Sequence, residues 1–212
     1  MKAIKTQIAI IFVCMALSFL IAPQLGAQDV PPEGIKAAEE GLPVYLELTH
    51  KVIEKKPSFK IEKLGFKKTD SIDQAYLGEA FRVYEIPTDI VLNYPKDTPV
   101  ESVLSKTDLW YFPVMIENEE RAILVVDKMK DSWRAVAFGS AQTAKGLAKI
   151  KRQWPKEEGY TPLLVQIYQP YMLLFTIPQY SAYNLTEIGA ESYLELGDAY
   201  DVINGLHTGT KQ

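Results

Sequence analysis

Residues 109–139 read LWYFPVMIENEERAILVVDKMKDSWRAVAFG, and this stretch decides the fold class. It holds three runs rich in β-branched and aromatic residues, at 109–117, 121–127 and 133–139. Only short polar gaps separate these runs, and such spacing is typical of β-hairpins. The stretch therefore predicts a three-stranded antiparallel meander. Because Pro113 lacks a backbone N–H, we expect its strand to be an edge strand or to carry a bulge.

A helix is expected on each side of this meander. Residues 35–54 carry apolar residues at helical spacing, and Gly41 and Pro43 interrupt the pattern, which predicts one kinked helix or two shorter ones. After the meander, Ser140 is suited to cap a second helix. One face of that helix carries mainly small and apolar residues, so it can lie close to a sheet.

The remaining segments complete an α+β pattern. Further strands are predicted at 80–86, 89–94, 163–168 and 171–177, and short helical segments at 71–77, 100–104 and either 188–194 or 199–203. Together these elements predict an antiparallel β-meander packed against helices in a single compact domain. This arrangement is similar to the cystatin-like and PepSY-like folds, in which a meander wraps a helix. The similarity concerns the fold alone and implies no function.

The N-terminus has the order of a secretory signal. Lys2 and Lys5 precede an apolar stretch at 8–22, and small residues follow up to Ala27. This order predicts a signal peptide at 1–27, cleaved after Ala27, and one exported domain at 28–212. The apolar stretch is short for a membrane span, which needs roughly 20 residues, although an uncleaved anchor is the alternative. We expect an extracytoplasmic protein, periplasmic or secreted, of bacterial type.

One weak internal similarity suggests two related halves, at about 35–139 and 140–205. Ile86-Pro87 and Ile177-Pro178 each end an apolar run, and Asn93 and Asn184 follow them at the same offset. So few matching positions make chance the better explanation.

Charge and residue usage narrow the function classes. Without the signal, 21 basic and 27 acidic residues leave a net charge of −6, which does not favour nucleic acid or anionic membrane surfaces. Cys14, the one cysteine, leaves with the signal. The two histidines, His50 and His207, are far apart in the sequence and have no neighbouring ligands at metal-binding spacing. We therefore expect no metal, no cofactor and, after cleavage, no stable membrane span.

Aromatic residues give the only positive signal for a binding site. Tyrosine and tryptophan offer rigid contact surfaces with a hydrogen-bonding group, as binding sites for sugars and extended peptides require. The binding residues that we predict are Trp110 and Tyr111, in the meander, and Tyr180 and Tyr183, in a loop-like stretch.

These observations favour a non-enzymatic binding module for a protein, peptide or glycan in the cell envelope. Its contact surface is expected at an open sheet face or at the edge strand around 110–114. One alternative is an envelope hydrolase that uses a carboxylate pair, with Glu85, Asp108 and Glu187 as the acids nearest to apolar strand ends. Another is a periplasmic chaperone or assembly factor, which would need an exposed apolar groove.

Overall fold

The computed structural model describes residues 30–168, 171–188 and 196–208, and within these ranges it contains four α-helices and nine strands. The helices are α2 (Pro32–Lys55), α3 (Thr88–Leu92), α4 (Ala141–Gln153) and α5 (Ala199–Thr208). The strands are β1 (Tyr76–Leu77), β2 (Phe81–Glu85), β3 (Ser105–Ile116), β4 (Glu119–Met129), β5 (Ser132–Gly139), β6 (Leu163–Tyr168), β7 (Tyr171–Thr176), β8 (Asn184–Glu187) and β9 (Gly197–Asp198). Short 3-10 helices lie at Ile61–Leu64, Ile72–Gln74, Val100–Val103 and Lys156–Glu158. The predicted signal peptide and its cleavage after Ala27 lie outside the described residues.

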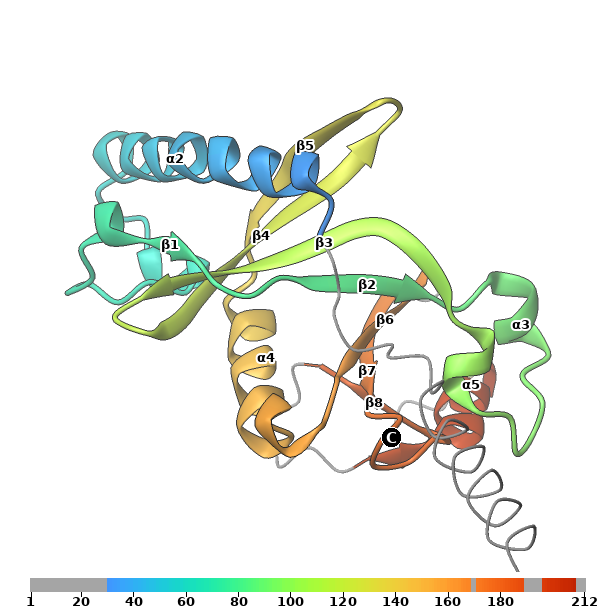
Figure 1. The fold of residues 1–212 in the computed structure, drawn as a ribbon. Coiled ribbons are helices and arrows are strands. Elements are labelled where there is room, and N and C mark those ends of the chain that lie inside the picture. Colours follow the sequence, from blue (N-terminus) through green and yellow to red (C-terminus); the bar gives the residue numbers. More distant parts are fainter. Residues whose placement is uncertain (1–29, 169–170, 189–195, 209–212) are drawn as a thin grey trace, which may run out of the picture.

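The strands form one sheet in the order β5–β4–β3–β2–β6–β7–β8–β9, with β1 beside β3 (Figure 1). The predicted meander is β3–β4–β5, and its neighbours pair antiparallel. At the centre of the sheet β2 and β6 pair in parallel, with Val83 opposite Leu164. The predicted α+β fold, a mostly antiparallel sheet with helices in a single domain, is thus confirmed.

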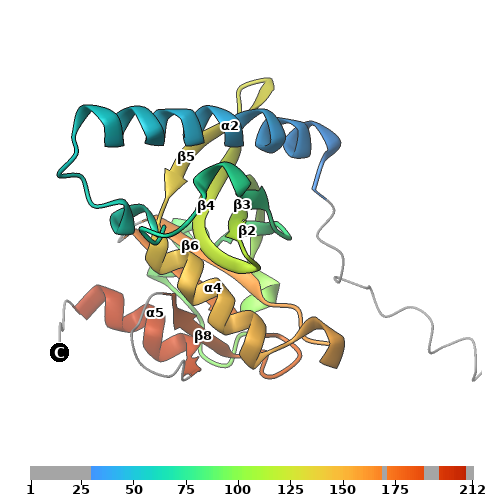
Figure 2. The same ribbon diagram turned by 90° about the vertical axis from the view of Figure 1, so that its left-hand side faces the viewer.

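The two longer helices cover opposite faces of the meander, because neighbouring residues of a strand point to opposite faces. Phe112 and Leu124 contribute to the core beneath α2, whereas Tyr111 and Ile123 contribute to the core beneath α4. Figure 2 shows α2 above the strands and α4 on their other side. At the other end of the sheet, α3 and α5 pack together with β6 and β8 in a third apolar core.

Several local predictions are corrected by the structure. The segment predicted as a strand at 89–94 is the helix α3: it begins after Pro87, whose carbonyl accepts hydrogen bonds from the N–H groups of Ile90 and Val91. Of the two alternatives for the first helix, that of two shorter helices is wrong, since α2 continues as one helix through Pro43. Only the 3-10 turn at Ile72–Gln74 forms from the helix predicted at 71–77.

The surroundings of Pro113 decide between the two alternatives for its strand. β3 lies inside the sheet, between β4 on one side and β1 and β2 on the other, so it is not an edge strand. Near Pro113, the register shift between β3 and β4 leaves the extra residue, Arg121, on β4. β3 has its own extra residues opposite β2, between Lys106 and Trp110. The strand therefore carries a bulge, but not at Pro113, and β5 is the edge on this side of the sheet.

Each half of the chain contributes a helix and a run of antiparallel strands, α2 with β2–β5 and α4 with β6–β8. The parallel pair β2–β6 joins the two runs, and the helices lie on opposite faces (Figure 2). However, Ile86-Pro87 follows β2, whereas Ile177-Pro178 follows β7. The two Ile-Pro pairs thus follow strands at different positions in their runs, and a duplication stays a prediction.

Candidate functional site

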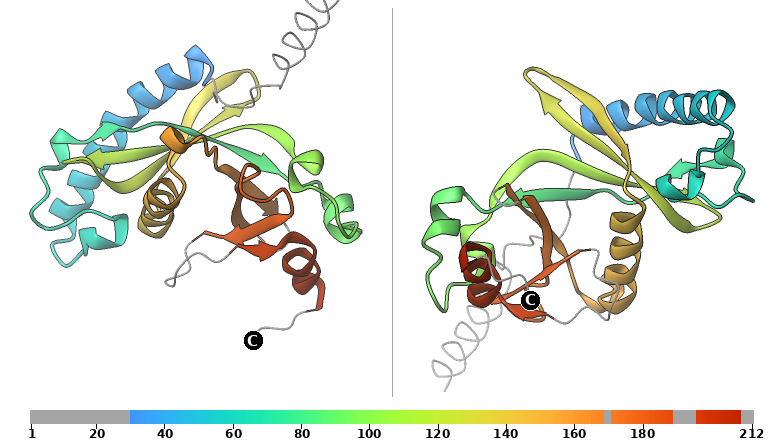
Figure 3. Two further views of the ribbon diagram at one scale, coloured as in Figure 1. Left: turned by 60° about the horizontal axis from the view of Figure 1, so that its bottom comes forward. Right: turned by 180° about the vertical axis from the view of Figure 1, so that it is seen from behind.

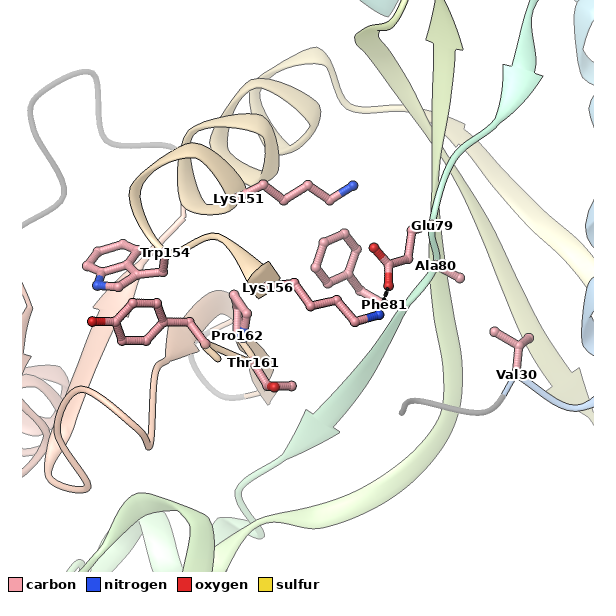
Figure 4. Close-up of a pocket in the computed structure, with 10 residues that line it drawn as sticks. Val30, Glu79, Ala80, Phe81, Lys151, Trp154, Lys156, Thr161 and Pro162 are labelled. Atoms are coloured by element: carbon pink, nitrogen blue, oxygen red, sulfur yellow. Dashed lines mark hydrogen bonds and ion pairs between the residues drawn. The ribbon is translucent and has the colours of Figure 1, made fainter. Parts of the chain in front are cut away.

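A pocket of about 190 Å³ opens beside the end of α4 that leads toward β6. Four segments form it: Val30 ahead of α2, the start of β2 with the two residues before it, the last turn of α4 and the loop before β6. The lining residues that matter for its chemistry are Glu79, Phe81, Lys151, Trp154, Lys156 and Tyr160. Figure 4 shows Phe81 between the lysine side chains, with Trp154 farther along the same cavity.

The aromatic wall is held firmly by the core. Trp154 ends α4, and its backbone N–H donates to the carbonyl of Ile150 at 2.9 Å. Its indole is 5 % exposed and packs against Phe175, with 5.5 Å between ring centroids. Phe81 begins β2 and is 7 % exposed, so both residues are packed into the core.

Three charged groups lie on this apolar wall. Lys156 Nζ donates to Glu79 Oε1 at 2.7 Å, and the hydrogen bond and charge of Glu79 raise the pKa of Lys156 (Figure 4). Lys151 Nζ lies 5.1 Å from the centroid of the Phe81 ring, a cation–π distance, and 3.8 Å from a carboxylate oxygen of Glu120. The pocket therefore presents two ammonium groups and one carboxylate beside aromatic rings.

None of the four predicted binding residues lines this pocket, although Tyr180 contacts its Trp154. Tyr180 is 62 % exposed and meets Trp154 edge-on, with 6.3 Å between ring centroids. Tyr183 is 45 % exposed and does not line the pocket.

The other two predicted residues belong to the core. Trp110 is completely buried beneath α2, and the guanidinium of Arg82 lies 4.8 Å from its ring centroid. Tyr111 is 7 % exposed on the opposite face, where burial and then the nearby Tyr171 hydroxyl raise its pKa. Trp110 and Tyr111 therefore do not form a common contact surface, because they lie on opposite faces of the sheet.

The sequence analysis missed Lys151, Trp154, Lys156 and Tyr160. They fall in the stretch KRQWPKEEGY at 151–160, where aromatic and basic residues gather around Pro155. That local mixture was the available signal, but only the fold shows that Phe81 and Glu79 complete the site.

A second charged cluster, at the loop before β1, has a structural role. Arg121 binds Asp70 with two nitrogens, Nε at 2.7 Å and Nη2 at 3.2 Å, and both side chains are at most 5 % exposed. Burial acts to raise the pKa of Asp70, but the hydrogen bonds from Arg121 and from the Lys67 backbone N–H outweigh it and lower the pKa. Arg121 also binds Glu119, whose pKa falls to about 2. This network fastens the loop to β4.

Three further findings concern the class of protein. Among the described residues, no three histidine, cysteine or carboxylate side chains converge as metal ligands would. None of the helices in the described ranges has the length and apolar character needed to cross a bilayer. Comparisons with family models, curated proteins and solved structures gave no match. The chemistry of the pocket must therefore be inferred from its own residues.

Proposed function

We propose that this chain is a non-enzymatic, extracytoplasmic binding module, and that its ligand site is the pocket beside Trp154. The observation that carries the proposal is the combination of fixed aromatic rings with two lysine ammonium groups at one opening. The volume of about 190 Å³ is below the usual range of roughly 300–1,000 Å³ for drug-sized ligands. The pocket therefore suits one ring or one side chain of a larger peptide or glycan.

The charges favour a ligand that carries a carboxylate. Lys151 and Lys156 would both attract it, and the ligand would compete with Glu79 for the exposed Lys156 ammonium. The Phe81 and Trp154 rings would cover the apolar part of the ligand and exclude water, which strengthens the charged contacts. An acidic sugar ring and the C-terminal residue of a peptide both have this combination of groups.

The two alternative functions find less support in the described residues. Hydrolysis by paired acids needs two carboxylates at one cleft, one with a raised pKa. The pocket contains Glu79 alone, and the carboxylates Glu47, Asp70 and Glu119 have lowered pKa values. A chaperone would need a broad apolar groove, whereas this pocket has a charged rim.

The test is a binding titration in which calorimetry measures the affinity. The probes are a glucuronic acid disaccharide and a short peptide with a free C-terminal carboxylate, each paired with a neutral analogue, glucose disaccharide or amidated peptide. We expect one acidic probe to bind at least about tenfold more tightly than its neutral analogue, as a charge-assisted contact implies.

Variants locate the site. Lys156→Ala should weaken binding of the acidic probe, while Lys96→Ala, an equal loss of charge in an exposed loop, should not. Loss of the exposed Lys156–Glu79 pair costs the fold at most about 1 kcal/mol, so the variant remains folded. Equal affinity in both variants, or no difference between acidic and neutral probes, would rule out the proposed site.

A further inference from the structure

Charge is strongly segregated along this molecule. Residues 51–68 contain seven lysines and two glutamates, a net charge of +5 in an otherwise acidic chain. Residues 157–210 contain seven acids and neither lysine nor arginine. The basic segment forms the C-terminal end of α2 and the loop after it, at the opposite end of the molecule from α5 (Figure 3, right).

Most of the basic charge in this segment is not neutralised locally. Lys51 pairs with Glu47, Lys67 with Glu119, and Lys68 lies 3.9 Å from Glu62. The other four, Lys55, Lys56, Lys60 and Lys63, are exposed and form no ion pair with any described residue. The other acids at this end are Glu54, on the helix, and Asp73, which binds His50 at 2.9 Å. Asp70 and Glu120 also lie there, and they pair with Arg121 and Lys151.

Apolar side chains lie among these lysines. Val44, Leu48 and Val52 follow one another at four-residue steps on α2 and therefore form one stripe, and they are 54 %, 48 % and 43 % exposed. Lys51 and Lys55 stand three residues after Leu48 and Val52, on the same side of the helix.

A hollow of about 470 Å³ beside the C-terminal end of α2 also combines apolar side chains with lysines. Its apolar lining includes Ile53, Phe59 and Ile61. Its charged lining has three lysines and two acids: Lys60, Lys67, Lys68, Glu62 and Asp70. Apolar surface bordered by ammonium groups is the arrangement found on helices that lie in a membrane interface.

We propose that residues 44–68, the basic end, dock on the surface of an anionic phospholipid bilayer. The lysines would contact lipid phosphates, and the stripe of Val44, Leu48 and Val52 would enter the headgroup layer. The net charge of −6 expected after loss of the signal argues against an anionic surface only at long range. Within a Debye length of about 10 Å at 0.1 M salt, the basic end dominates the interaction, because Asp198 on β9 and Asp201 on α5 lie at the opposite end of the molecule.

The experiment is co-sedimentation of the purified chain with vesicles. Vesicles of equal parts phosphatidylglycerol and phosphatidylcholine should bind the protein, and vesicles of phosphatidylcholine alone should not. Binding should weaken as salt rises from about 0.05 M to 0.5 M, because exposed charges are then screened. Equal binding to both kinds of vesicle, or binding to neither, would overturn the proposal.

Matched variants test the surface. Lys55→Gln combined with Lys56→Gln should weaken vesicle binding about thirtyfold, since each lysine near an anionic membrane adds a similar favourable contribution. Lys128→Gln combined with Lys130→Gln removes the same charge at the β4–β5 turn and should leave binding within about twofold of the original. Equal effects of the two pairs would mean that overall charge, not the basic end, controls binding.

The apolar stripe separates a bilayer from a soluble polyanion. Val44→Ser combined with Leu48→Ser should weaken vesicle binding about tenfold or more, as loss of buried apolar surface predicts. If this variant binds vesicles as well as the original chain does, and heparin displaces the protein from the vesicles, the partner is a soluble anionic polymer and not a bilayer. The Lys156→Ala variant should bind vesicles as the original chain does. A wrong proposal for the pocket can therefore be distinguished from a wrong proposal for the basic end.

Discussion

Gly41→Ala tests how closely α2 lies against the sheet. A Cβ atom at Gly41 would stand 2.3 Å from the Cβ of Ala135 on β5 and 3.9 Å from a methyl group of Leu124. Two apolar carbons rest at about 3.5–4.0 Å, so the helix and strand would have to separate by more than about 1 Å. Ala38 and Leu42 are both buried in the core on either side of this position, so the helix cannot move at one residue alone.

The expected change in stability is the difference of two effects. Alanine is favoured over glycine inside a helix by about 1 kcal/mol. Overpacking a close core contact costs about 1–3 kcal/mol, and a contact this short belongs at the upper end. We therefore expect Gly41→Ala to lower the free energy of unfolding by about 1–2 kcal/mol.

Urea unfolding of a double-mutant cycle measures this effect. Ala135→Gly removes the opposing methyl group, so combining it with Gly41→Ala should recover most of the loss, with a coupling energy of about 1.5 kcal/mol or more. Gly205→Ala on α5, where an added Cβ meets no atom within 4 Å, is the matched control and should not destabilise the protein. If Gly41→Ala instead stabilises the protein as the control does, α2 does not approach β5 as closely as described here.

Three further predictions concern buried polar groups. Arg121→Met leaves the buried Asp70 carboxylate without its partner and should cost about 3–5 kcal/mol in urea unfolding, whereas a loss below 1 kcal/mol would mean that the pair contributes little. Because the pKa of Asp70 is lower in the folded protein, its contribution to stability is complete above its unfolded pKa and is lost as the pH falls, between about pH 5 and pH 2. As the pH is lowered over that range, the urea midpoint of unfolding should fall less steeply for Asp70→Asn than for the original chain. Parallel plots of midpoint against pH would contradict this linkage. Tyr94→Phe removes the hydrogen bond from the Tyr94 hydroxyl to the Thr98 carbonyl, 2.9 Å, and should cost about 1 kcal/mol of thermal stability by calorimetry.

Local sequence patterns were reliable wherever one period dominated. The three β-rich runs of 109–139, with short polar gaps between them, predicted the strands of the meander, and the helical spacing in 35–54 predicted α2. The stretch at 89–94 failed because its apolar residues, Ile90, Val91, Leu92 and Tyr94, fit a short strand or a helical turn equally well. Pro87 and the third core decided for the helix.

The candidate site was less accessible than the fold. Aromatic content pointed correctly to Tyr180 as an exposed ring, but it selected Trp110 for the binding site and missed Trp154. Burial separates the roles of these two residues: Trp110 lies beneath α2, and Trp154 forms one wall of the pocket.

The sequence by itself determined the α+β class, the meander, the two longer helices and the segregation of lysines from acids, because these properties depend on neighbours within a few residues. Only the tertiary structure decided that β2 pairs with β6, that β3 is an interior strand, and that Phe81 meets Lys151. Contacts between residues that are distant in the chain depend on how whole faces pack, and no local periodicity records that choice.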